Sequence, residues 1–218
     1  MSAGTGGLWG TIAGPVDHEL VVKKSRFLAH LSPVASVADA DAVIARIRKE
    51  HWDARHHCVA LVVGTHADQQ RSTDDGEPSG TAGVPMLEVL RHRRVTDVVA
   101  VVTRYFGGVL LGAGGLVRAY SSAVSEALDV ARPVRRAVLT EVHVDVPHAD
   151  AGRLHGILRD WAAQHDGTLD DVAYRAEAQF TVLVPPAELD RFDADLAATS
   201  SGTLTARRHT DRVVDLPA

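Results

Sequence analysis

The chain has 218 residues, of which 45% are hydrophobic and 23% are charged. This composition is typical of one large globular domain or two small ones, at roughly 100–150 residues each. The single cysteine, Cys58, excludes an intramolecular disulfide and gives no sign of an oxidising compartment. Residues 1–14 lack the basic and apolar regions of a secretory signal, and no apolar run reaches the ~20 residues that span a bilayer. We therefore expect a cytoplasmic protein that does not contact a membrane.

Charge is distributed unevenly along the chain, whose formal net charge is −5. Residues 1–139 contain 16 Lys and Arg against 14 Asp and Glu, whereas residues 140–218 contain 7 against 14. Such asymmetry predicts two units with different partners, because an acidic segment repels polyanions. We expect RNA or another polyanion to meet the first half, and a protein partner to meet the acidic second half.

The first half predicts a domain of mixed strands and helices over 15–134, preceded by a flexible tail over 1–14. Its expected strands are 17–23, 26–31, 56–64 and 97–104. Its expected helices are 36–51, a short segment from Pro85 to Leu90, and a longer segment from Gly115 to Pro133. Ser36 is predicted to cap the first helix, with Asp39 in the capping-box position. Two long glycine-containing loops, 65–83 and 105–115, interrupt the pattern, and loops of this length are usually functional or disordered.

The second half, over 138–210, follows a boundary predicted at 132–137. Val142, Val144 and Val146 alternate with polar residues, as in a strand with one buried face. The elements expected here are a strand at 142–146, a helix at 154–161, strands at 169–174 and 179–184, a helix at 186–196 and a strand at 203–208. This βαββαβ order predicts a ferredoxin-like sandwich of one sheet and two helices. The fold class expected for the whole chain is α+β.

The first candidate for chemistry is the acidic segment DDGEPSGTAG at 74–83. Its carboxylates are Asp74, Asp75 and Glu77. Carboxylate oxygens suit Mg²⁺ or Ca²⁺, so one interpretation is a metal or acid–base site for a small ligand. The other is a solvated turn whose carboxylates cap backbone amides or pair with Arg104 or Arg118. Because the spacing lacks the alternation of an EF-hand loop, we predict no metal site.

The second candidate is RYFGGVLLGAGGLVRAY at 104–120, which follows a buried strand and opens a helix. Its glycines are Gly107, Gly108, Gly112, Gly114 and Gly115. Glycine permits a positive φ and close backbone approach, and the unpaired N–H groups at a helix start can bind an anion. The alternative is a tight structural turn. Neither GxGxxG nor GxxxxGK[ST] occurs in this segment, so no nucleotide cofactor is predicted.

The third candidate is a set of cationic and aromatic residues in the first half. They are Lys23, Lys24, Arg26, Arg104, Tyr105, Phe106 and Arg118. Cations attract phosphates and aromatic faces stack on bases, which predicts a nucleic-acid site with a few phosphate contacts. The alternative is an ordinary charged surface with the two aromatic residues in the core.

The segment Arg55–Cys58 (RHHC) predicts structure rather than catalysis. His56 and Cys58 share one strand face, but a zinc site needs three or four ligands, and neither HExxH nor GxSxG spacing occurs. We expect a hydrogen-bonded histidine beside a buried thiol. Trp52 and Trp161 are interpreted as packing residues. None of these segments predicts a catalytic residue.

Four of these segments together resemble the YigZ/IMPACT family. They are KKSRF at 23–27, DARHHCVA at 53–60, DDGEPSGTAGVPML at 74–87 and VVTRYFGGVLLGAGGLVRAYSSAV at 101–124. The resemblance implies a first domain similar to a domain of a small-subunit ribosomal protein. It also implies a second domain similar to the ferredoxin-like domains of elongation factor G, in agreement with the βαββαβ order of elements predicted above.

Three functions follow from the residues and the resemblance. The first is a translation-associated protein that contacts RNA or the ribosome through its first domain. The second is an enzyme for a small anionic ligand held at the two glycine-containing loops. The third is a protein adaptor without nucleic-acid binding. Eukaryotic members of the family regulate translation initiation with the help of an extra domain, which the matched segments do not include. We expect the first function, and a non-enzymatic protein.

Overall fold

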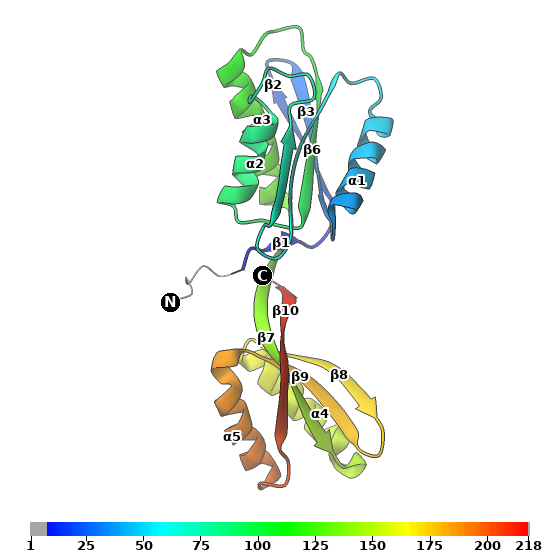
Figure 1. Cartoon of the computed structure of the whole chain (residues 1–218), viewed down its shortest axis with the longest axis vertical. Coiled ribbons are helices and arrows are strands. Elements are labelled where there is room, and N and C mark those ends of the chain that lie inside the picture. Colours follow the sequence, from blue (N-terminus) through cyan, green and yellow to red (C-terminus); the bar gives the residue numbers. More distant parts are fainter. Residues whose placement is uncertain (1–7, 218) are drawn as a thin grey trace. The chain divides into compact units, whose positions relative to one another are not determined.

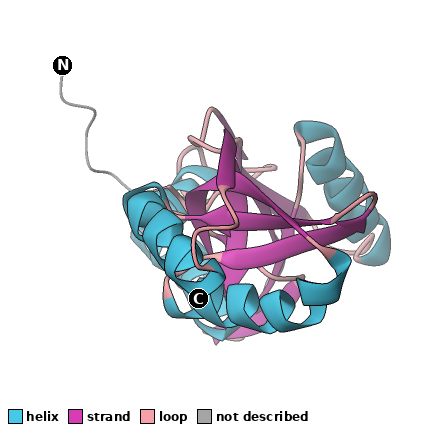
Figure 2. Cartoon of the chain, turned by 90° about the horizontal axis from the view of Figure 1, so that it is seen from below, coloured by secondary structure: helices cyan, strands magenta, loops and turns pink. Residues whose placement is uncertain are grey.

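The computed structural model describes residues 8–217, and the chain divides into two compact units. The first contains residues up to Arg136 together with Leu216, and the second is Ala137–Asp215. Each unit has its own sheet and helices (Figure 1), and Figure 2 marks the helices, strands and loops of the chain by colour. The chain is therefore α+β, as predicted. Among the described residues, no helix is long and apolar enough to cross a membrane.

The first unit is built on a five-stranded antiparallel sheet with the order β2-β3-β6-β4-β5. Its elements are β1 (Thr11–Ile12), β2 (Val16–Val22), β3 (Ser25–Pro33), α1 (Val37–Glu50), β4 (His56–Val63), β5 (Gln69–Thr73), α2 (Gly83–His92), β6 (Val98–Tyr105) and α3 (Ala113–Val130). The central strands β4 and β6 are buried on both faces, which explains why both read as continuous apolar runs.

Helices cover both faces of this sheet (Figure 1). On one face, Ile44 and Ile47 of α1 pack with alternate residues of β4 and β6, such as Val59 and Val101. On the other face, α2 and α3 bury the larger apolar cluster, which includes Tyr120. The start of α1 is as predicted, because the Ser36 hydroxyl accepts a hydrogen bond from the Asp39 amide at 3.1 Å.

Two predictions for the first unit were wrong in part. The part of the predicted tail that the structure describes contains β1, which pairs with the start of β7 and buries Ile12, while residues 1–7 lie outside the described residues. The predicted loop at 65–83 contains β5, an edge strand paired with β4. Its sequence, QQRST, has no apolar residue because most of its side chains face solvent.

The second unit has the predicted ferredoxin-like order of elements and strands, β10-β7-β9-β8. Its elements are β7 (Pro133–Val146), α4 (His148–Gln164), β8 (Thr168–Tyr174), β9 (Ala178–Val184), the short helix η1 (Pro186–Glu188), α5 (Leu189–Ser200) and β10 (Ala206–Pro217). Residues of α4 and α5 share one apolar cluster with Val142, Val144 and Val146. β10 begins three residues later than predicted and runs on to Pro217, through a polar sequence without clear alternation.

Candidate nucleic-acid interface

Four connections of the first unit meet at one end of its sheet. The antiparallel register sets Arg26 opposite Tyr105, and His56 opposite Arg104. This places together the turn between β2 and β3, the turn before β4, the loop after β5 and the loop after β6 (Figure 1). We call residues 23–26, 51–56, 73–83 and 104–118, which include the first turns of α3, the loop end of the sheet. Helices α2 and α3 both begin there, so the positive ends of their dipoles lie at this end.

The turn between β2 and β3 consists of Lys23 and Lys24, which are both exposed. Their φ angles are +46° and +67°, a left-handed pair that two-residue hairpins usually fill with Asn and Gly. Gly107 lies against this turn, because a Cβ at Gly107 would come within 2.0 Å of the Lys24 carbonyl carbon. The Gly107 amide also donates a hydrogen bond to the Ser25 hydroxyl at 3.1 Å. The loop after β6 is thus fixed to the two lysines.

Arg104 lies in a buried ion pair. Its Nη1 donates to Oε1 of Glu77 at 2.6 Å, and the Tyr120 hydroxyl donates to the same oxygen at 2.8 Å. The guanidinium lies 5.4 Å from the ring centroid of Phe27 and 5.7 Å from that of Phe106. Burial, followed by the influence of Cys58 and Glu77, raises the pKa of Tyr120. Arg104 therefore organises the loop end from inside, and does not extend into solvent.

The other two carboxylates of the acidic segment are also used internally. Burial tends to raise the pKa of Asp74, but hydrogen bonds from the amides of Gly80, Gly83 and Ala82 outweigh burial and lower it. The Asp75 carboxylate accepts from the His57 amide at 2.7 Å and from Arg48 at 2.9 Å. Together with the Glu77 pair, these contacts favour the interpretation in which the carboxylates hold the loop. Within residues 8–217, no group of three metal-ligating side chains occurs.

The remaining predicted glycines differ in their surroundings. Gly108 and Gly112 have positive φ angles of 83° and 72°, and a Cβ at either would meet open space. Gly112 is the N-cap of α3, whose first turn has no side-chain cap. A Cβ at Gly115 would lie 3.0 Å from the Leu111 side chain, whereas one at Gly114 would lie 3.7 Å from the Arg118 guanidinium. Only Gly115 is therefore closely packed among these four.

Several cations of the loop end have no ion-pair or hydrogen-bond partner for their side chains among the described residues. They are Lys23, Lys24, Arg55 and Arg118. Arg26 differs, because its Nε donates to Glu19 at 2.6 Å. Sequence reasoning did not single out Arg55 as a phosphate contact, although its place just before a strand whose start lies at the loop end was a usable signal.

A hollow of about 460 Å³ opens beside one of these cations, Arg55. It is lined by Asp53, Ala54, Arg55, His56, Arg104, Tyr105, Phe106 and Leu110. Phe106 is 55% exposed and Leu110 is 82% exposed, so the alternative that placed Phe106 in the core is wrong. Trp52, in the turn before β4, is 82% exposed and does not pack as predicted, whereas Trp161 packs against Phe192.

Cys58 and His56 have the structural surroundings that were predicted. Burial raises the pKa of the Cys58 thiol to about 12, and its Sγ lies 3.0 Å from the carbonyl oxygen of Asp74. Nδ1 of His56 lies 2.9 Å from the carbonyl oxygen of Asp75. Because a carbonyl only accepts, Nδ1 carries the hydrogen of this bond.

Comparison with known proteins places these features in a family. Residues 23–128 match the Impact N-terminal domain, and residues 144–203 match a domain of unknown function, DUF1949. The chain is 42% identical over 192 residues to "IMPACT family member YvyE" of Bacillus subtilis, which covers 88% of this chain and 87% of that protein. It is 41% identical over 198 residues to "IMPACT family member YigZ" of Escherichia coli, covering 90% and 95%.

The chain belongs to the IMPACT family. A solved structure described as an hypothetical protein shares 40% sequence identity, with 94% of this chain and 98% of that chain covered and a TM-score of 0.58. "Protein IMPACT" of Bos taurus is 35% identical over 105 residues, which are 45% of this chain and 32% of that protein. All of the predicted site residues lie within the Impact N-terminal domain match, between Lys23 and Arg118.

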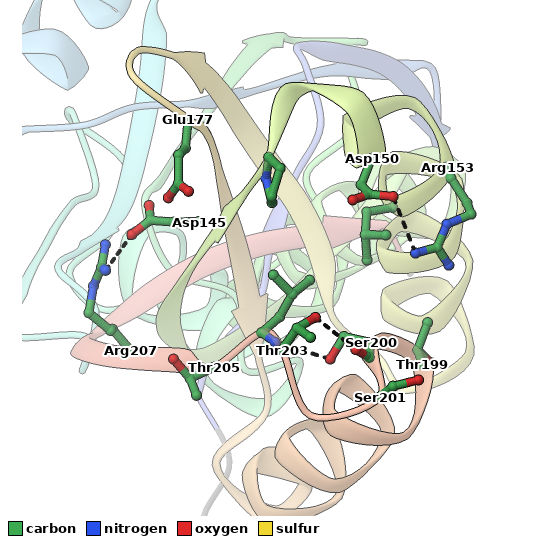
Figure 3. Close-up of a pocket in the computed structure, with 13 residues that line it drawn as sticks. Asp145, Asp150, Arg153, Glu177, Thr199, Ser200, Ser201, Thr203, Thr205 and Arg207 are labelled. Carbon is green, nitrogen blue, oxygen red and sulfur yellow. Dashed lines mark hydrogen bonds and ion pairs between the residues drawn. The ribbon is translucent and has the colours of Figure 1, made fainter.

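The second domain of this IMPACT family member has a hollow of its own, of about 430 Å³ (Figure 3). Both arginines of its lining pair with carboxylates: Arg207 pairs with Asp145, and Arg153 lies 3.7 Å from Asp150. One of its hydroxyls, that of Thr203, donates to the Ser200 carbonyl at 2.7 Å. The cations of this hollow therefore differ from the unpaired cations at the loop end.

Proposed function

We propose that this IMPACT family member acts in translation by binding RNA or the ribosome through the loop end of its first unit. The observation that supports this most is the group of exposed cations without partners among the described residues, Lys23, Lys24, Arg55 and Arg118. Free cations gain most from phosphate, because they lose no internal ion pair when they bind it.

The charge balance of the loop end favours an anionic partner. The negative charge of Glu77 is compensated by Arg104, that of Asp75 by Arg48, and that of Glu19 by Arg26. Asp74 is held by three backbone amides at the start of α2. Asp74 and Asp53 are the loop-end carboxylates without a cationic partner among the described residues, so the four free cations outnumber them.

The enzyme alternative has less support from the geometry. Its proposed acid, base or metal residues, Asp74, Asp75 and Glu77, each accept hydrogen bonds from the chain itself. These contacts hold the loop, and they explain the position of the carboxylates without a substrate. The four cations without partners therefore support binding more than catalysis.

The test is a salt titration with two matched triple variants. Lys23→Ala/Lys24→Ala/Arg118→Ala removes three free cations, and Arg71→Ala/Arg91→Ala/Arg93→Ala removes three exposed cations that pair with Asp41, Glu88 and Asp129. We expect the first variant to weaken binding of single-stranded RNA about tenfold or more and to reduce the slope of log K against log salt by roughly 2, at about 0.7 per phosphate contact. The second should bind nearly as the wild type. Equal loss in both variants would contradict the proposal.

Sedimentation with purified ribosomes distinguishes ribosome binding through RNA from the protein-adaptor alternative. Wild-type protein should co-sediment, and the Lys23, Lys24 and Arg118 variant should remain in the supernatant. A nuclease-resistant association that this variant retains would instead favour a protein contact. The acidic second unit is the surface that we propose for such a contact, since residues 140–218 contain 14 Asp and Glu against 7 Arg.

A further inference from the structure

We infer that the hollow at the loop end binds an unpaired nucleobase, so that this protein prefers single-stranded RNA to duplex RNA. This inference rests on the proposed function and assigns a ligand to one part of the same surface. The hollow lies beside the free cation Arg55, at the start of β4 and the end of β6. Its volume of about 460 Å³ lies within the range of sites that hold small ligands.

The lining consists mainly of flat groups suited to stacking. Phe106 is 55% exposed, and the Arg104 guanidinium lies 5.7 Å from its ring centroid. Tyr105 is held by a hydrogen bond from its hydroxyl to Asp53 at 2.9 Å, and by Arg26 at 5.8 Å from its ring centroid. Both rings are therefore positioned before a ligand arrives, and an exposed ring that is already fixed loses little freedom on binding a base.

Polar groups for the edge of a base also line the hollow. Nδ1 of His56 donates to the Asp75 carbonyl, and Nε2, which has no partner among the described residues, remains for the edge of a base. Asp53 has a second carboxylate oxygen beyond the one bonded to Tyr105. Arg55 offers guanidinium donors without an internal partner among the described residues. Acceptors and donors of this kind read the edges of unstacked bases, which a duplex hides.

The exposed apolar side chains distinguish this ligand from a phosphate alone. Leu110, at the rim, is 82% exposed, and Val109 beside it is 42% exposed. Phosphate contacts need no apolar surface, whereas a base covers it on stacking. The loop that carries these residues is fixed at Gly107 against the Lys23–Lys24 turn. One nucleotide can thus place its base in the hollow while neighbouring phosphates meet the lysines.

The experiment compares three RNA probes of equal length by fluorescence anisotropy with the full chain: a single strand, the same strand with abasic sites, and a blunt duplex of the strand with its complement. We expect the wild type to bind the intact single strand about tenfold more tightly than either other probe, the factor expected for the stacking of about one base. Phe106→Ala/Leu110→Ala should abolish this preference and leave the salt slope unchanged. Both side chains are exposed, so the variant should fold, and Phe106→Trp should keep the preference.

The outcomes separate this inference from the proposed function. If the double variant retains the tenfold preference, or if the wild type binds abasic RNA as tightly as intact RNA, the base site is overturned while RNA binding stands. If the wild type binds none of the three probes, both proposals fail. If the hollow variants lose only a protein partner from ribosomes, the hollow binds protein, and the base site is again overturned.

Discussion

The two units of the chain differ in how many of their cationic side chains pair with carboxylates. In the second unit, most arginines pair with carboxylates of that unit; they are Arg153, Arg159, Arg191, Arg207, Arg208 and Arg212. In the first unit, arginines such as Arg48, Arg71 and Arg104 are also paired, but four exposed cations of the loop end have no partner among the described residues. The second unit leaves one arginine side chain, Arg175, without a partner among the described residues, whereas the loop end of the first unit leaves four cations without one.

In the first unit, the residues that stabilise the fold differ from the residues that we propose to bind RNA. At the loop end, the buried groups fix the loops and the exposed groups stay available. The left-handed turn at Lys23 and Lys24 adds a conformation that asparagine or glycine would fill with less strain. Substitutions at the buried pair, at the loop carboxylate and at the strained turn can each test one of these separate roles.

The largest effect is expected from Glu77→Ala, which leaves Arg104 buried without its counter-charge. The two side chains are 4% and 8% exposed, and breaking a pair so buried typically costs about 3–5 kcal/mol of unfolding free energy. Urea unfolding, with peptide-level hydrogen exchange to locate the loss in the first unit, measures it. The control is Asp190→Ala in the second unit, whose side chain is 97% exposed and pairs with Arg208. Little change is expected there, because exposed pairs contribute little; equal losses would contradict the comparison.

The sequence shows much of this fold but not the pairing inside it. Ser36 and Asp39 predict the start of a helix, and the alternation of Val142, Val144 and Val146 predicts a strand. Both patterns can be recognised in the sequence because each involves residues only a few positions apart. β5 carries no such signal, since its side chains face solvent and its pairing with β4 is set by the tertiary fold.

The candidate site could be located from the sequence but not assigned in detail. Its glycines and cations mark the loop end, yet the choice between a free and a paired arginine depends on the tertiary fold. Arg104 meets Glu77 across 27 positions, and Arg118 meets no described partner. Arg55 was not predicted as a phosphate contact, and Trp52 was wrongly interpreted as a packing residue. The exposure of both side chains depends on how α1 ends and β4 begins, which the sequence does not show.

A smaller effect, dependent on pH, is expected at Asp74. Burial opposes ionisation of this carboxylate, but the amides of Gly80, Gly83 and Ala82 lower its pKa below that of the unfolded chain. A lowered pKa stabilises the fold above the unfolded pKa of about 4, and this contribution is lost as pH falls through the folded value. Asp74→Asn should therefore lose stability at neutral pH, and its difference from the wild type should shrink under acidic conditions.

The second unit supplies the contrast for Asp74. Hydrogen bonds from Arg207 and Gln179 lower the pKa of Asp145. Arg207 is an exposed surface cation, so salt should reduce the effect of Asp145→Asn, whereas the effect of Asp74→Asn should persist at about 1 M salt because fixed amides are screened less. Unfolding at neutral and acidic pH, with and without salt, measures both. A salt-sensitive Asp74 would show that its stabilisation is not from the loop amides.

The smallest change in stability, and of opposite sign, is expected at the Lys23–Lys24 turn. Lys23→Asn/Lys24→Gly supplies residues that tolerate φ angles of +46° and +67°, and should stabilise the first unit by about 1 kcal/mol while weakening RNA binding. Lys23→Ala/Lys24→Ala removes the same charges and keeps the strain, so it should weaken RNA binding equally without the gain in stability. Ser201→Gly relieves a φ of +53° in the second unit and should stabilise it without changing RNA affinity. If Asn–Gly stabilised the turn and left RNA binding intact, the lysines would be incidental to binding, and the free cations that distinguish the first unit would reduce to Arg55 and Arg118.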